Sequence, residues 1–358
     1  MADAGRTTLA GITAASLAGA ALARAAGPAP PRIKVGQIGM GHAHAAGKMA
    51  TLRQFAEDWE VVGLVEPDPA LRERLAADPA YRDVPLLSEE QLLAVPGLQA
   101  VAVETAVRDL IPTARRCVAA GLHVHVDKPA GESLPDFKAL LDEAASRGRV
   151  VQMGYMFRYN PAFLRCFAAV RQGWLGDVFE LHAVMSKKID AASRLRLAEY
   201  PGGTMFELGC HLIDAAVSVL GPPDNVVGFT RRNHAGQDSL ADNQLAVLEY
   251  PRATATIRST VLEPHGGERR QFTVCGERGT FDIRPLEPPR LQVSLESAAG
   301  PYAAGIHAVE LPPAGGRYDG EFVDLAAIVR EEKPADYSPA HDLAVHAAIL
   351  RASGLAVD

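Results

Sequence analysis

The feature that most constrains the fold is an apolar strand over residues 33–38 that runs directly into two closely spaced glycines, Gly39 and Gly41, and then into a helical pattern. This order is typical of the first turn of a doubly wound α/β sheet that binds a dinucleotide. Gly39 permits the tight turn, and Gly41 allows the backbone to approach a pyrophosphate. The third position of the motif, usually Gly or Ala, is His44. The residues of this turn predicted to bind the cofactor are Gly39, Met40, Gly41, His42, Ala43 and His44.

A second apolar run, residues 61–65, ends in Glu66, which follows His44 by 22 residues. A carboxylate at this position accepts hydrogen bonds from both ribose hydroxyls of NAD and repels the 2′-phosphate of NADP. Glu66 therefore predicts NAD rather than NADP as the cofactor. The alternative is a turn that binds no phosphate, in which Glu66 is a solvated residue at a strand end.

The composition is that of a globular protein with a small-molecule partner. The chain has 358 residues, of which 48% are apolar and 22% charged, and its net charge is −7. The densest basic clusters are Lys187–Lys188 and Arg231–Arg232, so the chain lacks the basic patch expected of a nucleic-acid-binding protein. The four cysteines are far apart in apolar or strand-like segments, which predicts buried thiols rather than a zinc or redox motif.

Residues 1–31 differ from the rest of the chain. Arg6 is followed by an uncharged stretch rich in Ala, Leu and Gly, and then by Ala-rich and Pro-rich sequence. This pattern predicts a secretion signal and an exported, periplasmic protein, since the stretch is too short and too weakly apolar to span a membrane. Only one arginine precedes it, whereas a twin-arginine signal has two. The alternative is a disordered N-terminal extension of a cytoplasmic enzyme.

Residues 32–153 predict a Rossmann domain. Short apolar runs alternate there with amphipathic stretches, which indicates a doubly wound parallel sheet. The ligand crevice of such a sheet lies at the carboxyl ends of its strands, where the sequence has Gly39, Glu66, Thr105 and Lys128.

Residues 154–358 predict a second α/β domain with an open, largely antiparallel sheet. Residues 245–250 and 253–259 are expected to form a hairpin around a turn at Pro251 and Arg252. Helices are expected over 161–173 and 204–220, and two closing helices over 321–330 and 340–353.

Two motifs carry candidate chemistry. Lys128 ends a buried strand and precedes Pro129, so it should project into the cleft, where burial would lower its pKa and let it share in proton transfer. Glu207, His211 and Asp214 follow one another at helical spacing on an otherwise apolar helix. His211 suits proton acceptance near neutral pH, and Glu207 is expected to orient its imidazole. The alternatives are a surface lysine and a structural histidine.

These motifs together resemble the Gfo/Idh/MocA oxidoreductases, and the resemblance extends over about residues 33–352. It rests on Gly39-Met-Gly41, Glu66-Pro-Asp68, Asp127-Lys128-Pro129, the segment 154–161 around Arg158, the segment 202–214, and Gly276-Glu-Arg-Gly279-Thr280.

The resemblance implies a Rossmann domain followed by a substrate-binding α/β domain whose sheet often mediates homo-oligomers. It further implies oxidation of a sugar or cyclitol hydroxyl, or reduction of the ketone, with a nicotinamide cofactor. By position, Lys128 matches the family lysine, His211 its proton acceptor, and Glu207 the acidic residue one turn earlier.

Three positions depart from the family pattern. Thr105-Ala106-Val107 replaces Thr-Pro-Asn beside the nicotinamide, Asp127 replaces Glu before the lysine, and Glu207 replaces the more frequent Asp. Thr105 and Asp127 are nevertheless predicted to contact the cofactor.

Further candidates for substrate binding are Arg158, Lys187 and Asp214. Arginine recognises acidic or hydroxylated groups bidentately, while the alternatives are a structural ion pair for Arg158 and a solvated strand end for Lys187. No metal site is expected, because the histidine pairs 42/44 and 123/125 have no third ligand nearby in sequence.

Three functions are compatible with these residues. The first is an NAD(H)-dependent oxidoreductase of sugar, cyclitol or related polyol hydroxyls, with His211 as proton acceptor and Lys128 polarising the forming carbonyl. The second is an NAD-dependent glycoside-cleaving enzyme that oxidises its substrate transiently. The third is a non-catalytic protein that senses NAD or a sugar on an enzyme fold.

Overall fold

The computed structural model describes residues 30–75, 77–313 and 315–357. The expected secretion signal in residues 1–31 lies almost wholly outside this part. Within the described ranges, no helix combines the length and apolar character needed to cross a membrane.

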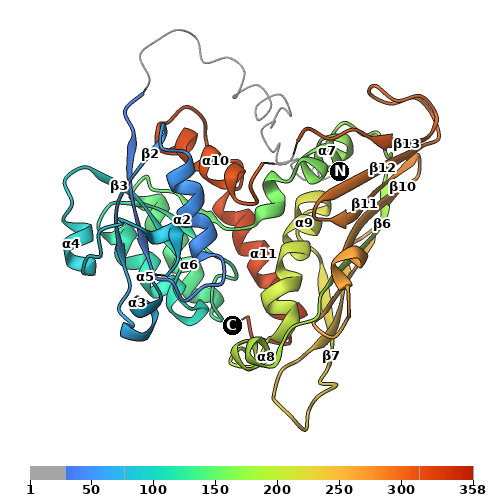
Figure 1. Ribbon diagram of the computed structural model, residues 1–358. Coiled ribbons are helices and arrows are strands. Elements are labelled where there is room, and N and C mark those ends of the chain that lie inside the picture. Colours follow the sequence, from blue (N-terminus) through green and yellow to red (C-terminus); the bar gives the residue numbers. More distant parts are fainter. Residues whose placement is uncertain (1–29, 76, 314, 358) are drawn as a thin grey trace, which may run out of the picture.

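The first sheet is parallel throughout and has the strand order β2-β1-β3-β4-β5. Helices lie on both of its faces (Figure 1), so the predicted Rossmann-type fold is confirmed. The elements are β1 (Ile33–Ile38), α2 (Ala45–Gln54), β2 (Trp59–Val65), α3 (Pro69–Leu75), η1 (Pro79–Tyr81), α4 (Glu89–Leu93), β3 (Leu98–Val103), α5 (Val107–Ala119), β4 (His123–Val126), α6 (Leu134–Ser146) and β5 (Val151–Met153).

The register of this sheet brings the carboxyl ends of its strands into one row. Ile38 pairs with both Val65 and Val103, Val103 pairs with Val126, and Val126 pairs with Met153. The next residue of each strand therefore lies at the same edge, and these residues are Gly39, Glu66, Glu104, Asp127 and Gly154.

The second sheet has the order β13-β12-β11-β10-β6-β9-β8-β7, and only the pair β6 and β9 is parallel. This confirms the open, largely antiparallel sheet. Its strands are β6 (Val178–Ser186), β7 (Asn225–Arg231), β8 (Asn243–Glu249), β9 (Thr254–Thr260), β10 (Gln271–Gly276), β11 (Gly279–Leu286), β12 (Pro289–Leu295) and β13 (Gly305–Val309).

The expected hairpin of residues 245–259 is β8 and β9, closed where the Tyr250 amide donates to the Ala253 carbonyl at 3.0 Å. Strands β11 and β13 were not expected from the sequence. Residues 280–284 of β11 do alternate polar and apolar side chains, but the strand follows a two-residue turn and contains Pro285, which weakens the strand signal. Strand β13 is short and mostly exposed, so its sequence gives no clear alternation.

Helices cover the face of the second sheet that is turned toward the Rossmann domain, and the opposite face is left open (Figure 1). Helix α11 contacts α6, α9 and β7, so it packs between the two parts of the molecule. The remaining elements are η2 (Met156–Tyr159), α7 (Pro161–Arg171), α8 (Ala191–Leu197), the π-helical turn η3 (Met205–Gly209), α9 (Cys210–Leu220), η4 (Gly266–Arg269), α10 (Asp319–Val329) and α11 (Pro339–Ala352).

Helix α10 returns to the Rossmann sheet although it lies near the end of the chain. Phe322 is fully buried and its ring meets Trp59 edge-on at 6.1 Å. Leu325 and Ala326 share the same apolar cluster with Ile33 and Val35 of β1. Helix α10 therefore covers the first sheet although it lies in the segment 154–358, which the sequence predicts to form the second domain.

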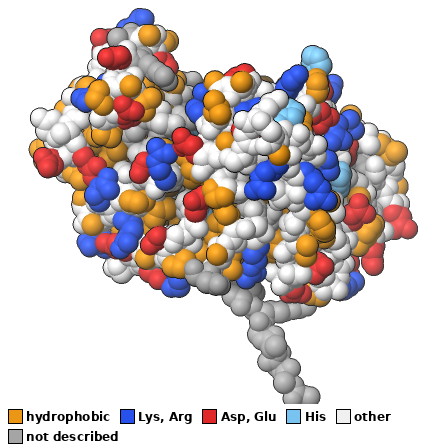
Figure 2. Space-filling model, turned by 90° about the horizontal axis from the view of Figure 1, so that it is seen from below, with side chains coloured by type: hydrophobic (Ala, Val, Ile, Leu, Met, Phe, Trp, Pro, Cys, Tyr) orange, Lys and Arg blue, Asp and Glu red, His pale blue; other side chains and the backbone are white. Residues whose placement is uncertain are grey.

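The surface in Figure 2 mixes basic, acidic and apolar side chains, and no single sign of charge covers the face shown. This arrangement agrees with the charge pattern of the sequence, which favours a small-molecule partner over nucleic acid.

Substitution of Phe322 by Ala should destabilise the protein by about 3–5 kcal/mol, because it leaves a cavity between α10 and the Rossmann sheet. The free energy of unfolding in urea measures this. Leu195→Ala is the control, since that side chain is 64% exposed and its loss should change stability by about 0.5 kcal/mol or less. A similar small change for Phe322→Ala would show that α10 does not stabilise the sheet.

Candidate active site

The glycine turn between β1 and α2 lies against the loop that follows β3. Gly39 has φ = 93°, and a Cβ there would be 2.6 Å from the Thr105 amide nitrogen. A Cβ at Gly41 would be 2.9 Å from the amide nitrogen of Ala106. Side chains at either position would push these loops apart, so the two glycines are required by the packing at this edge.

The carboxylate of Glu66 is held by the main chain of the same region. Its Oε2 accepts from the Met40 amide at 2.6 Å, and its Oε1 accepts from the Asp68 amide at 2.9 Å. Glu66 is 5% exposed, so its position is well defined at the wall of the crevice.

A cavity of about 730 Å³ opens beside this carboxylate. It combines the acidic group with apolar walls, which suits the ribose and base of a nucleotide. The predicted cofactor residues that line it are Gly39, Gly41, Glu66 and Thr105, and its apolar walls include Leu71, Leu86 and Pro112. These residues therefore fit a nicotinamide dinucleotide.

The two histidines of the turn face Asp127 rather than the cavity. Asp127 Oδ2 lies 2.9 Å from His42 Nδ1 and 3.1 Å from His44 Nδ1. Ala43 is exposed between them, and helix α2 begins only at Ala45. Burial lowers the pKa of His44 to about 4 despite the neighbouring carboxylate, so His44 is neutral at physiological pH.

His42, His44 and Asp127 bring three possible metal ligands within 4.8 Å of one another. The ammonium of Lys48, however, already lies 2.9 Å from Asp127 Oδ2. Because a fixed cation occupies the carboxylate, we interpret the cluster as an ionic hydrogen-bond network rather than a metal centre.

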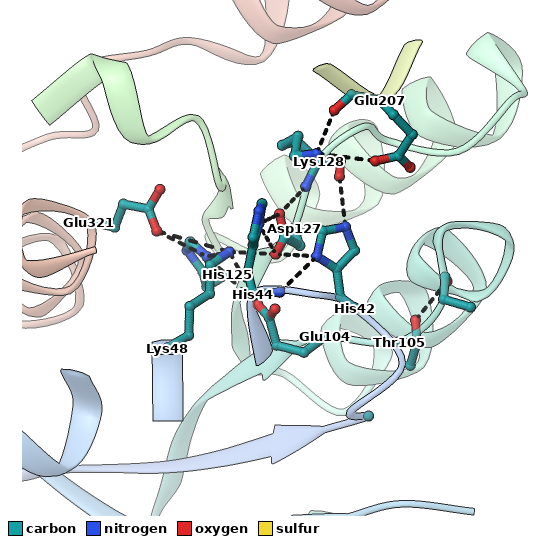
Figure 3. A network of polar contacts seen from close by, with 12 residues as sticks. His42, His44, Lys48, Glu104, Thr105, His125, Asp127, Lys128, Glu207 and Glu321 are labelled. Carbon is teal, nitrogen blue, oxygen red and sulfur yellow. Dashed lines mark hydrogen bonds and ion pairs between the residues drawn. The ribbon is translucent and has the colours of Figure 1, made fainter. Parts of the chain in front are cut away.

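Lys48 is the centre of a fully buried network (Figure 3). Its Nζ lies 2.8 Å from His125 Nε2, 3.2 Å from Glu104 and 3.9 Å from Glu321 of α10. A Cβ at Gly154 would be 2.7 Å from this Nζ, so glycine leaves the space for the ammonium.

The three carboxyl groups of this network differ in the direction of their pKa shifts. Burial raises the pKa of Glu321 to about 7 and that of Glu104 well above its usual range, although Lys48 opposes both shifts. Burial would also raise the pKa of Asp127, but His42 and Lys48 hold it well below its usual range. Asp127 is therefore the carboxylate that pairs with Lys48 as an ion.

Lys128 reaches from the Rossmann edge to the turn η3. Its Nζ donates to the Glu207 carbonyl at 2.8 Å and lies 3.3 Å from Glu207 Oε2. Burial would lower the pKa of Lys128, but the carboxylate of Glu207 outweighs it and the pKa is raised. The expectation of a lowered pKa was wrong, because a buried partner stabilises the ammonium. Lys128 is a charged hydrogen-bond donor.

His211 is 4% exposed, and its Nδ1 has no hydrogen-bond partner within the described ranges. Its ring packs against Tyr155 and Phe157, with centroids 6.1 and 5.6 Å away. Burial, and then the charge of Lys128, lower its pKa well below the usual value. His211 is thus a neutral imidazole near a fixed ammonium.

The expected stripe of Glu207, His211 and Asp214 is interrupted. The chain forms a π-helical turn over Met205–Gly209 before the regular helix α9, and a π-turn changes which side chains superpose. Glu207 consequently holds Lys128 and makes no hydrogen bond to His211. The predicted orienting role of Glu207 toward His211 is not seen in these contacts.

Two family models match this chain. Residues 33–155 match the model of an oxidoreductase family with an NAD-binding Rossmann fold, and residues 163–282 match the GFO/IDH/MocA C-terminal domain. The chain belongs to the Gfo/Idh/MocA oxidoreductase family. The resemblance noted in the sequence is thereby confirmed.

Relatives within the Gfo/Idh/MocA family are distant in sequence. The uncharacterized oxidoreductase YdgJ of Escherichia coli K12 is 28% identical over 260 residues, or 72% of each chain. A D-xylose 1-dehydrogenase (NADP(+)) of Haloferax volcanii is 28% identical over 234 residues, covering 64% of this chain and 70% of the relative. The crystal structure of an aldose-aldose oxidoreductase from Caulobacter crescentus has a TM-score of 0.76 at 20% identity, covering 90% and 98% of the two chains, and shows the shared fold.

Arg158 and Asp214 lie together behind the cleft of this Gfo/Idh/MocA protein. Arg158 Nη2 contacts Asp214 at 2.5 Å and Asp342 at 2.6 Å, and all three side chains are at most 3% exposed. The guanidinium also stacks on Tyr337 at 3.8 Å. These contacts match the alternative of a structural ion pair, since carboxylates engage both Nε and Nη2 of the guanidinium.

Several site residues were not found from the sequence. Lys48, Glu104 and Glu321 come from three separate elements, and no motif links them. The available signal was Lys48, which lies four residues after His44 on the helix that follows the glycine turn. The buried face of such a helix is usually entirely apolar.

Replacing Arg158 by Met should cost about 3–5 kcal/mol of stability, because Asp214 and Asp342 would be buried without their cation. Urea unfolding measures this loss. Arg252→Met is the control, since its pair with Asp177 is exposed on both sides and is worth about 1 kcal/mol or less. A raised KM with unchanged stability would instead support the substrate-binding interpretation.

Proposed function

We propose that this protein is an NAD-dependent oxidoreductase that oxidises a secondary hydroxyl of a sugar, cyclitol or related polyol, or reduces the corresponding ketone. The observation that carries the proposal is a charged lysine at the sheet edge that bears the glycine turn, paired with Glu207, four residues before a neutral histidine. Lys128 is held by Glu207, and the charge of Lys128 contributes to the lowered pKa of His211.

The two side chains have complementary roles in this proposal. His211 accepts the hydroxyl proton, since it is a neutral imidazole whose buried Nδ1 has no hydrogen-bond partner in the described ranges and is available to a substrate. Lys128 donates a hydrogen bond to the substrate oxygen as that oxygen gains carbonyl character. When bound, NAD supplies the hydride acceptor of the reaction.

Glu207 is a positioning residue for Lys128. Its carboxylate keeps the ammonium charged and its carbonyl fixes the direction of the side chain. The relatives whose names state a substrate include D-xylose and trans-1,2-dihydrobenzene-1,2-diol dehydrogenases, which supports a hydroxyl as the reacting group.

NAD is the proposed cofactor because the Glu66 carboxylate lies in the wall of the nucleotide cavity. Arg72 lines the same cavity and adds a positive charge, and a relative is named for NADP. The carboxylate is buried and held by two amides, whereas Arg72 is exposed, so the fixed group favours ribose hydroxyls over a phosphate.

A homo-oligomer through the open face of the second sheet is also proposed. Large apolar side chains lie exposed on this face, among them Val227 and Phe229 on β7, which are 38% and 48% exposed. Export of the protein is proposed from the sequence of residues 1–31 alone.

His211→Ala and Lys128→Met should each lower kcat by about 10²–10⁴-fold while NAD binding changes little. The measurement is the initial rate of NADH formation with a panel of aldoses and cyclitols. His234→Ala and Lys138→Met are matched controls, because both side chains are exposed. Variants within a few-fold of the parent would refute these roles, and cleavage of a glycoside without net NADH would assign the transient-oxidation reaction instead.

The parent protein should bind NAD at least ~10-fold more tightly than NADP, and Glu66→Ala should reverse or abolish this preference. Titration of both nucleotides by protein fluorescence or calorimetry measures the two dissociation constants. Arg72→Gln should leave NAD binding nearly unchanged. If the parent prefers NADP and loses that preference in Arg72→Gln, the assignment of NAD is wrong.

A further inference from the structure

Four cationic side chains come from the end of β4, the end of β6, the start of β10 and the loop before α10. We call Lys128, Lys187, Arg270 and Arg317 the cationic cluster. Lys187 follows β6, Arg270 precedes β10, and Arg317 lies in the loop before α10, so the chain assembles the cluster from both of its parts.

Neighbouring contacts fix this arrangement. The β6 and β10 strands pair antiparallel, and Arg270 Nε donates to the Ser186 carbonyl, one residue before Lys187, at 3.0 Å. Glu287 then bridges the two arginines, with its Oε2 3.1 Å from Arg270 Nη1 and its Oε1 2.7 Å from Arg317 Nη2.

The positive charge of the cluster is not balanced by these contacts. Two carboxylates face the four cations, and each is already engaged, Glu207 by Lys128 and Glu287 by both arginines. Lys187 is partly buried, and its ammonium makes no hydrogen bond or ion pair with any residue in the described ranges. The Lys187 ammonium is not among the fully buried atoms, so it can be reached by an anion from outside the protein.

The pKa values of Lys187 and Arg270 are lowered in this cluster. Burial, followed by the charges of Lys128 and Arg270, lowers the pKa of Lys187. Burial also lowers the pKa of Arg270, although Glu287 opposes this shift. The cluster lies near Lys128 because Tyr318, next to Arg317, packs on His44 of the glycine turn with ring centroids 5.6 Å apart, and because η3, which carries Glu207, contacts β6.

We propose that the substrate is an anionic carbohydrate whose carboxylate or phosphate binds Lys187 and Arg317 while its reacting hydroxyl faces Lys128 and His211. This substrate class rests on the proposed function. The two arginines and Lys187 offer the charge-assisted donors that such groups take, and Arg317 is exposed at the rim where the anion would enter. Neutral polyols leave Lys187 unpaired and should be poor ligands.

The test uses the full-length His211→Ala protein loaded with NAD, so that binding is measured without turnover. Calorimetry with a hexose, its uronic acid and its 6-phosphate compares one skeleton with no anion, a carboxylate and a phosphate. We expect at least one charged compound to bind ~10–100-fold more tightly than the hexose. Which of the two does so identifies the anion.

Lys187→Gln in the same background should remove ~10-fold or more of that advantage and leave hexose binding unchanged. Lys188→Gln, one residue along and exposed, should change neither. The proposal is overturned if the hexose binds as well as both charged compounds, if none of the three binds, or if Lys187→Gln weakens all three equally.

Rates with the parent protein separate this proposal from the proposed function. Oxidation of a neutral polyol with no preference for charge would uphold the oxidoreductase and overturn the anion site. Selective binding of the uronic acid or the phosphate without NADH formation from any compound would uphold the anion site and overturn the oxidoreductase.

Discussion

The ammonium of Lys48 is the constraint on which the site depends. It is buried without solvent, so its charge requires a partner, and Asp127 is the carboxylate held in the ionised form. Asp127 also accepts from both histidines of the glycine turn and from the Lys128 amide. One buried ion pair thus ties the β1–α2 turn to the end of β4, where the proposed catalytic lysine begins.

The contact between Lys128 and Glu207 depends in turn on the ion pair of Lys48 and Asp127. Lys128 leaves the Rossmann edge next to Asp127 and ends on Glu207, so the turn η3 of the second domain is positioned by a side chain of the first. His211 follows two residues after that turn. The position of His211, the proposed proton acceptor, relative to the Rossmann edge is therefore set through a chain of buried polar contacts rather than by apolar packing alone.

The sequence allowed prediction of both sheets and most helices, because the glycine turn, the alternation and the apolar runs are local signals. It could not show that α10 covers the first sheet or that Lys48, Glu104 and Glu321 meet, since these contacts join distant segments. The sequence also could not show which partner each charged side chain would meet in the folded protein. Lys128 was expected to lose its proton more easily, and Arg158 could be either a substrate-binding residue or part of a structural ion pair, until the positions of Glu207, Asp214 and Asp342 were known.

The return of α10 to the first sheet has a consequence for the order of folding. Trp59 and Phe322 are 263 residues apart along the chain, and Glu321 enters the Lys48 network from the same helix. A chain that leaves the ribosome with its N-terminal end first must keep the apolar face of β1 uncovered until α10 has been synthesised. The sheet beneath the nucleotide cavity is consequently fully covered only once α10 has been synthesised, although the residues that line the cavity all lie between positions 38 and 116.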